Sequence, residues 1–243
     1  MTETLHRLNA DLLLFFNSYH QEWCDNFMLL FTDRFTWIPL YVFIVGIIIH
    51  CYGWRRALII FVGVALTITL ADQLCASVLR PMFKELRPSN PENPLSEFVT
   101  VVNGYRGGRY GFPSCHAANT FALTAFLYVI IPKRKFLVFT LVWALMNCYS
   151  RMYLGVHYPG DILAGAAIGS VIGYGVARSV EAVLRRIGNS EGSHKDAGFT
   201  YKPFTVPIVK FNGSEISFYS IDTGIAAGIG IIIVIGVLAF FHV

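Results

Sequence analysis

The chain has 243 residues, of which 55% are hydrophobic, 15% aromatic and only 14% charged, and its mean hydropathy is +0.55. This composition excludes an ordinary soluble enzyme and indicates an integral membrane protein in a lipid bilayer. The net charge of +4 fits orientation signals better than nucleic-acid binding, because the polar stretches lack interleaved basic and aromatic residues. We expect one membrane domain over residues 1–243.

The N-terminal residues 1–22 predict a helix with apolar side chains among polar neighbours. This pattern suits a helix lying in the membrane interface, and an ordinary helix packed on the bundle explains it equally well. Residues 1–20 lack the basic start, apolar stretch and cleavage site of a secretory signal, so we expect the N-terminus to be retained. The five cysteines have no CxxC spacing and are interpreted as small buried hydrophobic residues.

Apolar runs predict an all-α bundle of six transmembrane helices. Five spans fall within 23–179, residues 180–220 form a connector, and 221–243 hold the sixth span. The start of the first span is the least defined, because Phe27 to Phe31 would extend it outward past Arg34. The expected spans are 36–51, 57–79, 116–132, 135–150, 158–179 and 221–242.

Charge in the loops predicts the orientation. If six spans alternate, segments 52–56, 132–135 and 180–220 share one side, and their basic residues make that side cytoplasmic. Segments 80–113 and 150–157 then face the periplasm or exterior of a bacterial inner membrane. Within the connector, an Asn212-Gly213 pair between alternating apolar residues predicts a small cytoplasmic β-hairpin.

A first polar cluster follows the second span and contains Arg80 and Arg87. Pro81 and Pro88 disfavour a continuous helix there, so the two arginines lie on a broken segment. A guanidinium offers a planar set of donors that matches phosphate oxygens. Taken alone, the same arginines are explained as well by contact with lipid headgroups.

A second cluster, Pro113-Ser114-Cys115-His116, begins the third span. Ser114 is a suitable N-cap, and the free backbone N–H groups behind it favour an anion. A helix cap by itself explains Ser114 but does not explain the imidazole of His116 beside it.

The third cluster extends from Ser150 to Asp161. Pro159 belongs in the first turn of a helix, so the fifth span should begin near Tyr158 and bring Asp161 within reach of His157. A carboxylate on one ring nitrogen makes the other nitrogen a better base or nucleophile. Together with Arg151, this pattern favours a functional site over an isolated buried histidine. A charged side chain within the bilayer costs about 2.5–3.5 kcal/mol of insertion free energy, so several such groups beside membrane spans indicate a function.

These clusters resemble the three motifs of the type 2 phosphatidic acid phosphatase (PAP2) superfamily, K-x6-R-P, P-S-G-H and S-R-x5-H-x3-D. The matching segments are Arg80-x6-Arg87-Pro88, Pro113-Ser114-Cys115-His116 and Ser150-Arg151-x5-His157-x3-Asp161. The resemblance covers residues 80–161 and implies a six-helix membrane phosphatase that needs no metal or other cofactor.

The resemblance also implies residue roles. His157 would be the nucleophile that forms a phosphohistidine, Asp161 would orient it, and His116 would protonate the leaving oxygen. Residues Arg80, Arg87, Ser114, Cys115 and Arg151 would bind the phosphoryl group. Arg80 and Cys115 stand where the family has lysine and glycine, so we expect a changed pocket shape and a less certain backbone contact at Cys115.

Three rival interpretations remain. His116, His157 and Asp161 would suit a two-histidine, one-carboxylate metal site, although three arginines would repel the cation. A cysteine phosphatase is disfavoured because Phe121, and not arginine, lies six residues after Cys115. A lipid-binding or lipid-transport protein without catalysis would keep phosphate recognition alone.

The expected partner is a membrane lipid phosphate that enters laterally. We rank undecaprenyl diphosphate first and lipid A phosphates second, ahead of phosphatidate and phosphatidylglycerophosphate. Arg106 and Arg109 either contact a second anionic group of the substrate or are solvated loop charges. Neither the monophosphate or diphosphate preference nor the oligomeric state follows from the sequence.

Overall fold

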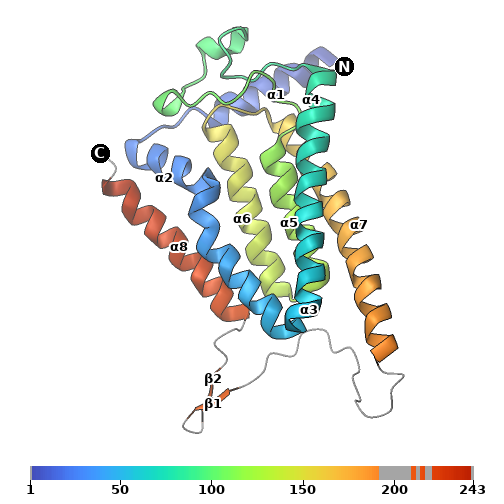
Figure 1. The fold of residues 1–243 in the computed structure, drawn as a ribbon. Coiled ribbons are helices and arrows are strands. Elements are labelled where there is room, and N and C mark those ends of the chain that lie inside the picture. The colour runs from blue at the N-terminus through green and yellow to red at the C-terminus, as the bar shows by residue number, and fades with distance from the viewer. Residues whose placement is uncertain (1, 192–208, 212–213, 217–220, 242–243) are drawn as a thin grey trace.

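The computed structural model describes residues 2–191, 209–211, 214–216 and 221–241, and it is a bundle of helices (Figure 1). Helix α1 (Thr2–Phe16) lies across one end of the bundle. It buries Leu13 and exposes Leu5, Leu8, Leu12 and Phe15. One side of α1 therefore packs on the bundle while an apolar side faces outward, and the position of this helix in the membrane interface stays a prediction.

Helix α2 (Glu22–Thr32) is separate from the first expected span. A 3₁₀ turn over Arg34–Trp37 follows it, and the Asp33 side chain accepts a hydrogen bond from the backbone N–H of Phe35. The Trp37 indole N–H donates to the Phe31 carbonyl over 2.8 Å, which holds this corner together. The possible extension of the first span through Arg34 is therefore wrong, because the helix breaks at Asp33.

The first two expected spans both lie in α3 (Ile38–Gln73), which is interrupted at Gly53 with φ 73° and ψ 157°. A residue with a side chain rarely adopts this backbone conformation, so a glycine at this position permits the chain to reverse direction (Figure 1). A π-helical turn over Leu74–Leu79 and the short α4 (Arg80–Phe83) continue the second half. Lys84, with φ 51°, ends the helix between the two arginines of the first cluster.

The remaining helices are α5 (Cys115–Ile130), α6 (Arg134–Tyr153), α7 (Pro159–Glu191) and α8 (Ile221–Phe241). Among the described residues, the helical stretches 34–83, 159–187 and 222–240 are long and apolar enough to cross a membrane, and α5 is a shorter apolar helix. We therefore treat the chain as an integral membrane protein, and the count of six spans stays a prediction. Helix α6 buries polar residues, including Asn147 and Arg151, which lowers its hydropathy.

Two features concern the expected connector. Helix α7 continues past residue 179 to Glu191, so the segment 180–220 begins in a helix, where Glu181 pairs with Arg178 and Arg185 at 2.6 and 2.5 Å. Strands β1 (Val209–Phe211) and β2 (Ser214–Ile216) pair antiparallel. The Asn212-Gly213 pair lies outside the described residues, and the cytoplasmic position of this segment stays a prediction.

Close packing of α5 on α7 positions the polar clusters. Gly165, Gly169 and Gly173 recur every fourth residue of α7, where an added Cβ would overlap the carbonyl oxygens of Ser114, Ala118 and Ala122 on α5. Small residues at this spacing let two backbones approach directly. The helix that begins beside His157 is thereby fixed against the helix that begins beside His116.

Candidate active site

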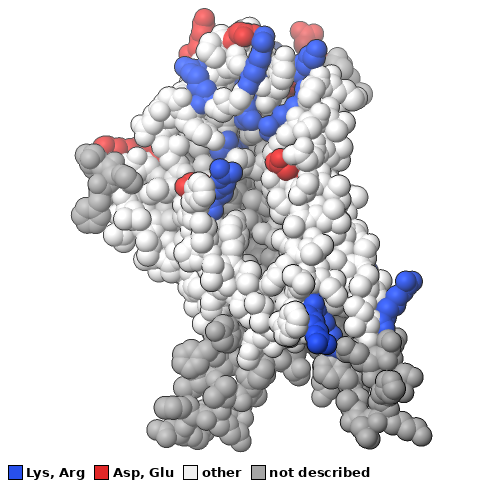
Figure 2. Space-filling model, viewed as in Figure 1, with Lys and Arg blue, Asp and Glu red and all other residues white. Residues whose placement is uncertain are grey.

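The three clusters lie at one end of the bundle. They come from α4 and the loop after it, from the start of α5, and from the end of α6 with the turn into α7. Basic side chains gather at this end and also lie in a hollow between the helices (Figure 2). Segments far apart in the chain thus form one basic region.

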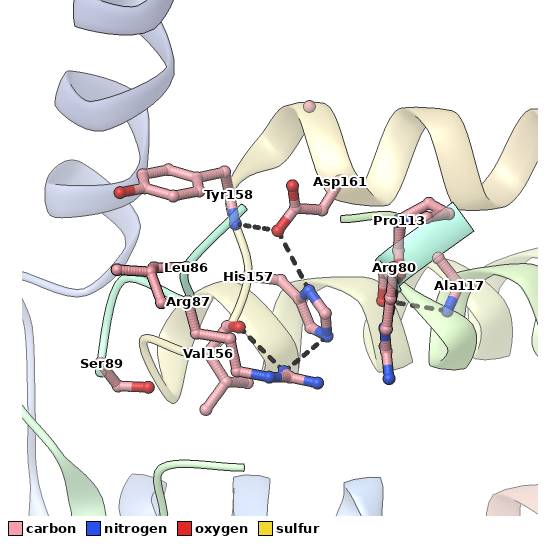
Figure 3. Close-up of polar contacts among 12 residues, drawn as sticks. Arg80, Leu86, Arg87, Ser89, Pro113, Ala117, Val156, His157, Tyr158 and Asp161 are labelled. Atoms are coloured by element: carbon pink, nitrogen blue, oxygen red, sulfur yellow. Dashed lines mark hydrogen bonds and ion pairs between the residues drawn. The ribbon is translucent and has the colours of Figure 1, made fainter. Parts of the chain in front are cut away.

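His157 lies between Asp161 and Arg87 (Figure 3). Its Nδ1 is 3.1 Å from Oδ2 of Asp161, and its Nε2 is 2.8 Å from Nη1 of Arg87. A guanidinium can only donate, so Nε2 must accept and the ring proton must be on Nδ1, which donates to Asp161. The ring therefore presents the lone pair of Nε2 toward the arginine.

Asp161 joins the second and third clusters. Its Oδ2 also accepts the backbone N–H of Tyr158 over 3.0 Å, and its backbone carbonyl accepts the N–H of Ser114 over 3.0 Å. The Oδ1 atom is buried and has no hydrogen-bond partner among the described residues. The carboxylate is thus held at the N-terminus of α7, where the helix dipole favours negative charge.

A glycine-containing loop covers Arg87. The backbone N–H of Arg87 donates to the Arg109 carbonyl over 3.1 Å. An added Cβ at Gly107 would lie 3.2 Å from the guanidinium carbon, and one at Gly111 would lie 3.0 Å from Oδ2 of Asp161. Arg87 also donates to the Val156 carbonyl over 3.0 Å. The loop therefore holds the guanidinium against His157.

Burial and neighbouring positive charge govern protonation here. The pKa of His157 is held well below its usual value, first by burial and then by the charges of Arg87 and Arg151, with a smaller contribution from His116. Burial, with the charges of Arg80 and Arg151, lowers the pKa of Arg87 to about 10. At neutral pH the imidazole is therefore neutral and the guanidinium charged.

The first two clusters meet at Pro113. Nε and Nη2 of Arg80 both donate to the Pro113 carbonyl over 3.3 Å. The hydroxyl of Ser114 accepts the N–H of Ala117 over 3.4 Å, so this side chain is the N-cap of α5. Cys115, the next residue, is buried.

Arg151 is fully buried, with 2% of its surface exposed. Its Nη1 donates to the Thr32 hydroxyl over 3.0 Å and its Nη2 donates to the Tyr105 hydroxyl over 2.9 Å. Neither partner was identified from the sequence, because a lone threonine in a helix and a loop tyrosine carry no distinctive spacing. They hold the guanidinium in place without neutralising its charge.

A cavity of about 510 Å³, here called the basic cavity, opens at this end of the bundle. It is lined by His116, Cys115 and four arginines, which are Arg34, Arg80, Arg87 and Arg151. Ser114, His157 and Asp161 do not line it, and Arg87 lies between the cavity and the Nε2 atom of His157. Four positive charges around a space of this size favour an anion.

Two further expectations concern charge and metal. Arg109 pairs with exposed Glu92 at 2.7 Å, Arg106 donates to the Ser89 carbonyl, and neither lines the basic cavity. Arg34, which belongs to none of the three clusters, lines it instead. Within the described part of the chain, no group of three or more His, Cys, Asp or Glu side chains is arranged to hold a metal ion.

The chain is similar to several characterised proteins. It is 49% identical over 188 residues to the lipid A 4'-phosphatase of Bacteroides thetaiotaomicron, which covers 76% of this chain and 84% of that protein. It is 31% identical over 215 residues to the lipid A 4'-phosphatase of Porphyromonas gingivalis, covering 86% of this chain and 90% of that one. An undecaprenyl-diphosphatase of Sulfolobus acidocaldarius is 28% identical over 173 residues, with 68% and 75% covered.

The fold is also similar to a solved structure. The transmembrane PAP2-type phosphatidylglycerolphosphate phosphatase of Bacillus subtilis superposes with a TM-score of 0.55 at 20% identity, covering 75% of this chain and 89% of that one. A sequence model of the PAP2 superfamily matches residues 57–185, which include all three clusters. The motifs, the fold and the sequence similarity agree, and the chain belongs to the PAP2 superfamily.

Proposed function

We propose that this protein is a lipid A 4'-phosphatase that cleaves a phosphate monoester through a phosphohistidine at His157. The observation that carries the chemistry is the orientation of the imidazole, whose Nε2 lone pair faces Arg87 while Asp161 accepts the proton of Nδ1. The substrate is supported by the two lipid A 4'-phosphatases to which the chain is 49% and 31% identical. Lipid A therefore replaces undecaprenyl diphosphate as our first choice.

In the first step the substrate phosphate enters the basic cavity and attracts Arg87 away from His157. Nε2 then attacks phosphorus, the bond from phosphorus to the sugar oxygen breaks, and His116, in its imidazolium form beside the bound phosphate, gives a proton to that oxygen. Asp161 stabilises the positive charge that develops on the ring. Arg80, Arg87 and Arg151 bind the phosphoryl oxygens, where spread negative charge needs mainly positioning and neutralisation.

In the second step the now neutral His116 takes a proton from water. The water oxygen attacks phosphorus, the bond to Nε2 breaks, and inorganic phosphate leaves with His157 neutral again. Four arginines line the cavity, so these residues supply the charge that a metal ion supplies in other phosphatases.

For orientation we propose six spans, with the two halves of α3 counted separately and the basic cavity facing the periplasm of the inner membrane. Arg55, Arg56 and the Lys133-Arg134-Lys135 run lie at the ends of helices remote from the cavity, which fits a cytoplasmic side. Cysteine labelling from outside intact cells, at a cysteine introduced beside Glu92 and another beside Arg134, tests this proposal. Labelling of the second site alone would contradict it.

The chemistry is tested with purified protein and ³²P-labelled lipid A. We expect free phosphate, loss of the phosphate at the 4' position by mass spectrometry, and a protein-bound label that is lost in acid and stable in alkali. His157→Gln should abolish both products, while His6→Gln, on the exposed part of α1, should change neither. Label retained in His157→Gln would contradict the nucleophile.

The same preparation separates the rival functions. Activity that persists in EDTA and is inhibited by vanadate is expected for the histidine mechanism, whereas the opposite pattern would support a metal site. Lipid binding without phosphate release from any lipid would support a lipid-binding or transport protein and overturn the proposal.

A further inference from the structure

A second cavity adjoins the basic cavity. It measures about 620 Å³ and lies between the two halves of α3 and α5, with a mainly apolar lining that includes Ile44, Ile48, Val64 and Leu123. We call it the apolar cavity. Residues that line both cavities are Arg34, Tyr41, Asp72, Asn119, Thr120 and Trp143. A lipid whose phosphate lies among the arginines would place its acyl chains in the apolar cavity and its connecting group at this border.

The border carries acceptors that the described residues do not satisfy fully. Nδ2 of Asn119 donates to Oδ1 of Asp72 over 3.3 Å, and Gln73 donates to Oδ2 over 3.5 Å, which is long for a hydrogen bond. Because a carboxylate cannot donate, the amide NH₂ must face Asp72 and the amide oxygen must face away. That oxygen, Oδ1 of Asn119, is buried without a hydrogen-bond partner among the described residues.

A phosphate alone does not explain these groups. A phosphate dianion offers only acceptors, and the charge of Asp72 repels it. A buried acceptor without a donor, here Oδ1 of Asn119, costs free energy, and the half-buried carboxylate of Asp72 receives only two long hydrogen bonds. Both groups are best satisfied by a ligand that brings donors to the border. Those donors must lie between the phosphate and the acyl chains.

We propose that Asp72 and Asn119 form an acceptor pair that binds hydroxyl or amide N–H donors on the headgroup bearing the scissile phosphate, and so selects a sugar lipid over a simple lipid phosphate. This inference rests on the proposed function and names the group that determines its substrate. Lipid A carries both kinds of donor near its phosphate. Phosphatidic acid carries neither, because its acyl chains are joined through esters.

The test compares phosphate release from lipid A, phosphatidylglycerophosphate and phosphatidic acid by the purified full-length protein in detergent micelles. The variants are Asp72→Leu and Asn119→Leu, which keep side-chain volume and remove the acceptor. Ser77→Ala is the matched control, since Ser77 is exposed on the same helical stretch and its hydroxyl contacts only Gln73 among the described residues.

The sign of the change decides the outcome. For lipid A we expect kcat/KM to fall about 10- to 100-fold in either variant, since lost hydrogen bonds to charged or buried groups are worth that much. For phosphatidic acid, Asp72→Leu should raise kcat/KM, because a repelling charge has gone. Ser77→Ala should match the wild type on all three lipids. If Asp72 only balances the arginines or supports folding, activity on every lipid will fall together, and this overturns the acceptor pair.

Phosphatidylglycerophosphate separates the two proposals, because its headgroup carries a hydroxyl but no amide N–H. The wild type could release no phosphate from lipid A and still prefer phosphatidylglycerophosphate to phosphatidic acid. If the variants then remove that preference, the result contradicts the lipid A assignment and supports the acceptor pair. A preference for lipid A that neither variant changes overturns the acceptor pair and leaves the lipid A assignment intact.

Discussion

Arg87 contacts His157 on the side opposite Asp161, with its Nη1 atom 2.8 Å from the Nε2 atom that would attack phosphorus. In this structure the attacking nitrogen is therefore covered by the arginine that is expected to bind the phosphate. In the proposed mechanism, substrate binding and exposure of Nε2 are one event, because the phosphoryl oxygens compete with the imidazole for the same guanidinium.

Replacing each of the two arginines of the first cluster by lysine should lower kcat/KM to different extents. Arg87 is buried and donates from Nη1 to both Val156 and His157, so Arg87→Lys should lower kcat/KM about 10- to 100-fold through loss of a planar donor set. Arg80 directs Nε and Nη2 at one carbonyl over 3.3 Å, and Arg80→Lys should cost about threefold or less. Steady-state phosphate release measures both, and equal losses would contradict the distinction.

The role of His116 can be tested through the leaving group. If His116 protonates the departing oxygen, His116→Ala should slow lipid A cleavage by about 10²- to 10⁴-fold. A substrate such as p-nitrophenyl phosphate, whose leaving group needs no proton, should lose much less in the phosphorylation step. Burst kinetics with this substrate should then show accumulated phosphoenzyme, since water activation is also impaired. Equal loss of the first step on both substrates would exclude the acid role.

The depressed pKa of His157 predicts a pH dependence of stability. The pKa of His157 in the unfolded chain is about 6.5. In the folded protein its pKa is well below that value, so the buried ring stays neutral at pH values where the unfolded chain is protonated. As pH falls below 6.5 the unfolded state binds the extra proton, so stability is lost, at a limiting slope of about 1.4 kcal/mol per pH unit.

Thermal denaturation in detergent between pH 7.5 and 5 measures this effect. The midpoint of the wild type should fall more steeply with decreasing pH than that of His157→Gln, which has no proton to bind at this position. Parallel curves for the two proteins would show that the ring titrates normally in the folded state.

The close contact between α5 and α7 predicts that two glycine-to-alanine substitutions in α7 will affect stability differently. At Gly169 a methyl group would overlap the Ala118 carbonyl, whereas at Gly175 it would meet nothing within 4 Å. Gly169→Ala should destabilise the protein by about 1–3 kcal/mol through overpacking and reduce activity by separating the helices. Gly175→Ala should be neutral or stabilise by about 0.5–1 kcal/mol, because alanine is the better helix former. Melting curves and phosphate release on both proteins check this.

The sequence predicted α5, α6 and α8 within about three residues of their observed bounds, because hydropathy and proline position depend on local residues. The starts of α5 and α7 at Cys115 and Pro159 follow from an N-cap serine and a first-turn proline. The break at Asp33 was missed, because it depends on a capping contact inside a run that is otherwise apolar. The extension of α7 to Glu191 was missed for the converse reason, since polar residues there still form a helix through paired charges.

Motif spacing likewise indicated which side chains would meet but not how they would be arranged. That Arg87 covers His157 depends on the path of the loop between α4 and α5. Arg34, Asp72 and Asn119 lie in no motif, and only the packing of α3, and of the 3₁₀ turn before it, near α5 brings them to one cavity border.

The hydrogen bond from Arg151 to Thr32 ties the third motif to a region that precedes residue 57, where the superfamily match begins. Asn17 lies in the same N-terminal region and donates to the Tyr153 carbonyl over 2.7 Å. A fragment of residues 57–185 would contain every motif residue and lack these supports. Substitutions before residue 57 are therefore expected to change the turnover rate even where all residues of the three motifs are unchanged.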